Sequence, residues 1–185
     1  MKFRTFLSIG MVAATLSACG GGGGDWQQGT TAASDTQPLA AGMHKLTFSA
    51  ISTAQLDAPI SGVEVAVKLP AGLSVSTLSG GTGQITPAAV SQGSALQDTS
   101  LAFGSYSAST RTAYLAMTTP QNNYRSGQYL TLQFAVAAGS LITPNDIYAM
   151  NATYPLYKVV GLDSVSHSSV VLTGKVKTTL GVAGL

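Results

Sequence analysis

The sequence predicts an all-β protein, an antiparallel β-sandwich that follows a secretion signal and a linker. Two features of its 185 residues favour this fold: stretches in which polar and apolar residues alternate, and Gly- and Pro-rich turns between them. The cleanest alternation spans residues 63–69, where three valines and Leu69 share one face while Glu64 and Lys68 occupy the other. A third feature is that no segment has the spacing of a convincing amphipathic helix.

The same alternation places the other strands along the chain. Residues 79–98 are expected to be a loop that Ile85 and Val90 attach to the core. Residues 144–146 are expected to turn, with Asp146 as a turn former, and calcium binding there is a weaker alternative. The expected strands are 45–51, 63–69, a short piece at 73–75, 101–106, 111–118, 128–136, 147–153, 156–162 and 169–177.

The strands 101–106 and 111–118 are predicted to form a β-hairpin. Its inward side chains are expected to be the apolar ones at alternate positions, Leu101, Phe103, Ala113, Leu115 and Met117. For the inward side chains of both strands to share one face of the sheet, the loop between the strands must hold an odd number of residues, and a loop of residues 108–110 meets this condition. That register sets Tyr114 beside Gly104, where an aromatic ring can cover the bare glycine backbone.

The amino-terminal residues indicate an exported chain. Lys2 and Arg4 precede a mostly apolar stretch that is too short to span a membrane, so residues 1–18 are expected to be a signal peptide. The order Leu16-Ser17-Ala18-Cys19 resembles a bacterial lipobox. This resemblance implies that Cys19 carries lipid and becomes the first mature residue, although an ordinary signal with a chance cysteine is the alternative. Gly20, in place of an aspartate, implies anchoring in the outer membrane.

Residues 19–42 are expected to be a lipidated, flexible linker, and residues 43–185 the sandwich. The linker begins with five glycines, has no periodicity and contains Trp26, which suits either the lipid headgroup region or a docking role. Cys19 is the only cysteine, so no intrachain disulfide can form. Lipidation also removes a thiol that would otherwise be exposed outside the cell.

The charge of the chain gives no reason to expect nucleic acid as a partner. Nine Lys and Arg residues face seven Asp and Glu residues, and removal of Lys2 and Arg4 with the signal leaves seven of each. The mature chain is therefore formally neutral, and it has no cluster of basic residues that could hold phosphates. Only 9% of the residues are charged, which is typical of a polar but uncharged exported surface.

The order of these segments resembles the cohesin-like family, within the wider group of carbohydrate-binding jelly-roll modules. The resemblance is carried by residues 60–65, Leu69-Pro70-Ala71-Gly72-Leu73-Ser74-Val75, the hairpin with Leu101-Ala102-Phe103, and residues 126–136. It covers about residues 44–175 and implies a nine-stranded jelly roll with a role in binding rather than catalysis. Cohesins hold a dockerin and sit in multi-module scaffolds, and nothing in this sequence identifies such a partner.

Residues with catalytic or metal-binding potential are few and scattered. His44 and His167 are the only histidines, show no metal-ligand spacing, and are expected to be solvated residues at strand ends. There is no Gly-x-Ser-x-Gly motif, and two of the seven acids would have to meet in space to act as a glycosidase pair. We therefore expect no enzyme, no cofactor and no metal, with a glycan hydrolase as a remote alternative.

Outward-facing aromatic residues are the remaining candidates for a site. In residues 128–136, the apolar side chains at 130, 132, 134 and 136 are expected in the core, so that Tyr129 faces outward. If this strand neighbours the hairpin, one face carries Tyr106, Tyr114, Tyr124, Arg125 and Tyr129. Tyrosines on a sheet suit a protein interface or sugar stacking, but they also occur there simply because they pack well on strands. The sequence thus predicts a protein-binding or structural role, with a polysaccharide-binding module as the alternative.

Overall fold

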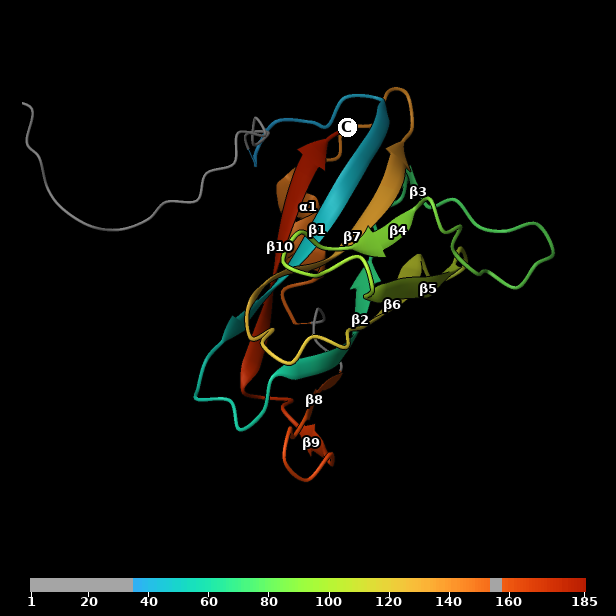
Figure 1. Cartoon of the computed structure of the whole chain (residues 1–185). Coiled ribbons are helices and arrows are strands. Elements are labelled where there is room, and N and C mark those ends of the chain that lie inside the picture. Colours follow the sequence, from blue (N-terminus) through green and yellow to red (C-terminus); the bar gives the residue numbers. More distant parts are fainter. Residues whose placement is uncertain (1–34, 154–157) are drawn as a thin grey trace, which may run out of the picture.

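Two antiparallel β-sheets pack face to face in the computed structural model, which describes residues 35–153 and 158–185 (Figure 1). This part of the chain holds ten strands, where nine were expected, and one short helix. The elements are β1 (Gly42–Ser52), β2 (Ile60–Lys68), β3 (Leu73–Ser74), β4 (Val90–Gln92), β5 (Leu101–Ser107), β6 (Thr112–Thr118), β7 (Gly127–Val136), α1 (Pro144–Met150), β8 (Lys158–Leu162), β9 (Ser169–Val171) and β10 (Val176–Gly184).

The first sheet has the order β10-β1-β7-β3, with β4 also pairing to β7, and the second has the order β5-β6-β2-β8-β9. The predicted antiparallel sandwich is therefore confirmed, while its jelly-roll type stays a prediction. The core lies between the sheets because the inward positions of both are apolar. Its largest fully buried side chains are Tyr129, Phe48, Phe134, Leu46, Ile60, Leu69, Met117, Leu130, Leu132, Ile147, Leu172 and Val63.

The predicted alternation in β2 is confirmed, since Val63, Val65 and Val67 are buried and Glu64 is exposed. Ile85 and Val90 are also buried, as the loop prediction required. The loop nevertheless contains a strand that was not predicted. Residues 90–92 pair with β7 as β4. This strand was not predicted because a three-residue segment is too short to show a period in the sequence.

The helix α1 replaces the turn expected at 144–146 and the strand expected at 147–153, so both predictions were wrong. Thr143 is its N-cap, Pro144 stands in the first turn, and Asp146 completes a capping box by accepting hydrogen bonds from the Thr143 backbone N–H and hydroxyl, both at 2.8 Å. Proline and a reciprocal cap together favour a helix start over a strand. Ile147 then packs into the core with no exposed surface.

The helix connects the two sheets. The Asn151 side chain accepts a hydrogen bond from the Lys68 backbone N–H and donates one to the Lys68 carbonyl, each at 2.8 Å, on β2 of the second sheet. On the other side, the Tyr148 hydroxyl accepts a hydrogen bond of 3.2 Å from the Val182 backbone N–H of β10 in the first sheet. One short helix thus closes the opening between the sheets, and Asn151 is almost completely buried.

The last strands differ from the prediction at their boundaries. The strand expected at 156–162 is present as β8 from Lys158, and residues 156 and 157 lie outside the described part. The single strand expected at 169–177 was wrong, because the chain turns at Gly174, which has a φ of +91°, and divides it into β9 and β10. β10 then runs to Gly184 and pairs with β1 along nine positions.

Residues ahead of position 43 pack against the sandwich. The Leu39 side chain is buried, its backbone N–H donates to the Ile142 carbonyl at 2.8 Å, and Asn145 N–H donates to the Asp35 carbonyl at 3.0 Å. Residues 35–42 therefore contact the sandwich, and the expected domain boundary at 43 stays a prediction. The expected signal peptide, Cys19 and Trp26 lie outside the described residues. No helix among the described residues is long and apolar enough to cross a membrane.

Candidate functional site

The outer faces of the two sheets differ in chemistry. The first sheet presents mostly small or polar side chains that are half-buried against one another, among them Lys45, Thr47, Ser49, Thr131, Gln133 and Thr179. Its large exposed apolar side chains, Met43 and Ile51, lie apart at the two ends of β1. The second sheet presents large apolar side chains to solvent, namely Leu101, Phe103, Tyr114, Leu162 and Val171. A gathering of large exposed apolar groups on one face marks that face as a candidate interaction surface.

The register of the predicted hairpin places Leu101, Phe103 and Tyr114 on the outer face of the second sheet. The hairpin itself is confirmed as β5 and β6, but Gly104 pairs with Leu115, and Tyr114 pairs with Ser105 rather than with Gly104. The loop has four residues, 108–111, because Arg111 adopts a left-handed conformation with a φ of +52° and joins the turn. An even loop reverses the faces of β5, so the inward orientation expected for Leu101 and Phe103 was wrong. They are 63% and 53% exposed.

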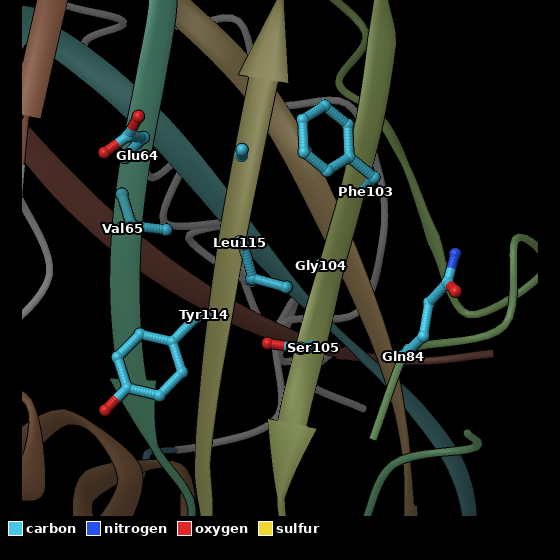
Figure 2. A pocket seen from close by; sticks show the side chains of 9 residues that line it. Glu64, Val65, Gln84, Phe103, Gly104, Ser105, Tyr114 and Leu115 are labelled. Carbon is cyan, nitrogen blue, oxygen red and sulfur yellow. The ribbon is translucent and has the colours of Figure 1, made fainter. Parts of the chain in front are cut away.

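A hollow of about 400 Å³ lies on this outer face, over β2, β5 and β6. Figure 2 shows Phe103 and Tyr114 at its opposite ends, with Ser105 across from Tyr114 on β5 and Gln84 at the side. The two rings stand diagonally across the hairpin, since Phe103 pairs with Ala116 and Tyr114 pairs with Ser105. We call this the aromatic hollow, and its lining is Glu64, Val65, Gln84, Phe103, Gly104, Ser105, Tyr114, Leu115 and Ala116.

Gly104 allows β5 to lie close to β6, with its missing side chain on the core side of the sheet. A Cβ atom at this position would lie 2.5 Å from the Tyr114 carbonyl oxygen and 2.7 Å from a methyl carbon of Leu115. Leu115 reaches into the space beside the glycine, as Figure 2 shows, and contributes apolar floor to the hollow. A side chain at position 104 would therefore displace both the neighbouring strand and this floor.

The polar groups around the aromatic hollow suit binding more than acid–base chemistry. Among its lining residues, Glu64 is the only carboxylate and no histidine is present. General acid–base catalysis on a glycan needs two carboxyl groups at a set separation. Glu64 pairs across the strands with Lys158 of β8, which places a cation near it. No group of three or more metal-ligating side chains occurs in residues 35–153 and 158–185.

No protein family, no curated protein and no solved structure matches this chain.

Tyr129 is not part of an outer surface, so its predicted orientation was wrong. A β-bulge in β7 leaves it without a partner on β1, since Phe48 pairs with Leu130 and Ser49 pairs with Gln128. The extra residue turns the ring inward. Its hydroxyl bonds the Thr178 hydroxyl at 3.0 Å, and burial raises the pKa of the phenol far above its ordinary value.

The other residues of the expected tyrosine face are also dispersed. Tyr124 is buried and donates a hydrogen bond of 2.9 Å to the Gly127 carbonyl, and burial raises its pKa. Arg125 donates to the Leu56 carbonyl at 3.0 Å. Tyr106 packs partly against the core, and burial raises its pKa. β7 and the hairpin lie in different sheets, so the five residues form no common face, and only Tyr114 lines the aromatic hollow.

Phe103, Glu64 and Gln84 line the aromatic hollow, although none of them was predicted as a site residue. Glu64 was correctly placed outside, but Phe103 was assigned to the core, and Gln84 came from a segment treated as a loop. The available signal was the Gly104 position between two larger residues, because a strand glycine often marks a close approach. That signal does not reveal which neighbouring strand approaches.

The two histidines have different environments. His44 is buried, which corrects the solvated position expected for it. Its ring stacks on Phe134 with centroids 5.8 Å apart, Nε2 lies 2.8 Å from the Ala40 carbonyl oxygen, and Nδ1 has no hydrogen-bond partner. His167 is exposed in the loop after β8 with a φ of +54°. Neither histidine lines the aromatic hollow.

Proposed function

We propose that the chain is a non-catalytic, lipid-anchored protein of the bacterial envelope whose β-sandwich binds another protein through the aromatic hollow. One observation carries this proposal: the second sheet exposes Phe103 and Tyr114 together around an apolar hollow, whereas the exposed large apolar side chains of the first sheet, Met43 and Ile51, lie apart at the two ends of β1. Exposed aromatic anchors beside a concave apolar floor are the usual centres of protein interfaces.

The energetics favour a partner on this face. About half of each ring is exposed, so covering both removes about 200 Å² from water, which is about 5 kcal/mol before the costs of association. The matching partner surface is an apolar or aromatic side chain that enters the hollow. Ser105, Gln84 and the Tyr114 hydroxyl stand at its margin, where they can hydrogen-bond the backbone of a partner segment.

The anchor half of the proposal rests on the lipobox-like Leu16-Ser17-Ala18-Cys19 and the basic, then apolar, residues before it. Lipid on Cys19 with several acyl chains would hold the protein stably on a bilayer. Gly20 after the cysteine supports the outer membrane as its location. The resemblance to cohesin-like modules agrees with a binding role, and the two-sheet architecture is compatible with such a module.

A polysaccharide is the second candidate ligand. Two exposed rings at opposite ends of one hollow, with Glu64 and Gln84 beside them, could stack on sugar rings and accept or donate hydrogen bonds to their hydroxyls. The full chain should then be retained by insoluble envelope or plant glycans, and Phe103→Ala with Tyr114→Ala should abolish retention. Equal retention of the double variant and the wild type would remove this candidate.

Photocrosslinking in intact cells tests the protein-binding proposal. A photoreactive amino acid at position 105 stands in the aromatic hollow, and the crosslinked partners are identified by mass spectrometry. We expect one dominant adduct that disappears when Phe103 and Tyr114 are both alanine. Val171→Ala is the matched control, because Val171 is exposed on the same sheet but does not line the hollow. An adduct that survives the double substitution would contradict the proposal.

A further inference from the structure

The end of the sandwich at which the chain enters carries its own exposed apolar residues. The described chain begins at Asp35, whose carbonyl accepts a hydrogen bond from Asn145 N–H, and it runs past Ile142 into β1. At this end Leu141 is 80% exposed, Met43 46% and Met150 38%. Figure 1 shows the segment before β1 and the loop after β7 together at this end of the sandwich, while β9 lies at the opposite end.

Leu141 and Met150 border a second hollow, separate from the aromatic hollow. It has a volume of about 550 Å³ and is formed by the turn after β2, the loop before α1, and α1 itself. Its lining is mostly apolar: Pro70, Ala71, Ser140, Leu141, Ile142, Asp146, Ala149 and Met150. The one carboxylate, Asp146, is already engaged by the Thr143 backbone and hydroxyl groups. We call this surface, together with Met43, the anchor end.

The length of chain outside the described residues limits what can cover the anchor end. Residues 20–34 separate Cys19 from Asp35. If they form the linker that their composition predicts, its mean end-to-end distance is about 20 Å. If Cys19 is acylated, its lipid stays in the bilayer. The anchor end is then the part of the domain that is held nearest to the lipid surface, at a high effective concentration. Because the domain is held close to the bilayer, weak apolar contacts are enough to keep the anchor end on the lipid surface.

We propose that the anchor end rests on the bilayer, with Leu141 inserted at the boundary between headgroups and acyl chains. Leucine and methionine side chains are suited to this depth, and Asp146 at the rim favours a zwitterionic over an anionic lipid surface. This orientation directs the opposite end of the sandwich away from the membrane and leaves the aromatic hollow accessible at the side. The inference rests on the lipid anchor of the proposed function and does not depend on the partner of the aromatic hollow.

Nitroxide labelling tests this orientation on the full-length acylated protein in vesicles of phosphatidylethanolamine and phosphatidylcholine. With Cys19 acylated, Leu141→Cys supplies the only free thiol, and Val171→Cys is the matched control because Val171 is an exposed apolar residue on β9. We expect the label at 141 to lose accessibility to a water-soluble nickel chelate and to gain accessibility to oxygen. The label at 171 should stay accessible to the chelate.

Three outcomes contradict the inference in distinguishable ways. Equal chelate accessibility at 141 and 171, with acylation verified by the mass of the amino-terminal peptide, overturns the membrane contact alone. An unacylated Cys19 overturns the anchor and the inference together. Shielding of the label at 141 without vesicles, in a non-acylated Cys19→Ser background, shows that the leading segment rather than the bilayer covers Leu141.

Discussion

At the scale of single residues, Tyr129 shows why alternation alone misplaces a side chain. The residues around it alternate perfectly, and this pattern predicts an outward ring. A bulge adds one unpaired residue to β7, and both Tyr129 and Leu130 then face the core. The side chain that was expected to bind a partner instead fills the interior and bonds Thr178, so substitutions there would report on folding and not on binding.

Asn151 is the residue whose removal should be most costly for its size. Its side chain satisfies the Lys68 N–H, the Lys68 carbonyl and the Ile147 carbonyl. Asn151→Ala leaves these partly buried backbone groups without their partner, and we expect a loss of about 2–4 kcal/mol in the free energy of unfolding. Urea denaturation measures this loss. Asn145→Ala, at an exposed position of the same helix, should change stability little; equal effects of the two variants would contradict the bridging role of Asn151.

At the scale of elements, the β5–β6 hairpin could be predicted but its faces could not. The sequence shows two short alternating strands with polar residues between them, and these define a hairpin. Loop length decides which side chains point inward, and it depended here on a left-handed conformation at Arg111, a residue that rarely adopts one. The wrong register therefore assigned Phe103 to the core, whereas its side chain lies on the solvent face.

The left-handed backbone conformation of Arg111 gives a test of the hairpin geometry. Arg111→Gly should raise the free energy of unfolding by about 1 kcal/mol, because glycine adopts a φ of +52° without steric cost. Thermal and urea denaturation would detect the gain. Ala108→Gly in the same loop has no positive φ to relieve, so it should leave stability unchanged or lower it. A loss of stability in Arg111→Gly as large as in the control would argue against the four-residue loop.

The capping box of α1 makes the helix sensitive to acid. Hydrogen bonds from the Thr143 backbone and side chain hold the pKa of Asp146 below its ordinary value of 3.8. The stabilisation is therefore fully present above that value and is lost as the pH falls through the lowered pKa. We expect wild type and Asp146→Ala to differ in urea midpoint near pH 6 and to converge as the pH falls below 3.8 and through the lowered pKa. A difference that grows on acidification would contradict this sign.

At the scale of the whole molecule, the sandwich was predictable because both sheets bury one apolar face and the turns carry Gly and Pro. The helix was not predicted, although Thr143, Pro144 and Asp146 form a legible start signal, because the apolar residues after it are too few to show a helical period. The aromatic hollow could not be predicted, since it arises where three strands meet and only their register determines which side chains share a face.

The asymmetry of the two outer faces leads to a prediction about stability. Phe103 and Tyr114 are more than half exposed, so replacing both by serine should change the free energy of unfolding by no more than about 1 kcal/mol. The same substitutions should abolish the crosslinks proposed above. Denaturation of the double variant beside the crosslinking assay separates the two effects, and a large loss of stability would assign the rings to the fold.

The pairing of β1 with β10 also has a consequence in time. Thr47 contacts Gly181, which follows it by 134 residues, and β1 lies between β7 and β10. At about 5–20 residues per second, a ribosome makes the matching strand roughly 7–27 s after β1 has emerged. During this interval Leu46 and Phe48 have no final neighbour on that side, so this edge of β1 stays unpaired until β10 has been made.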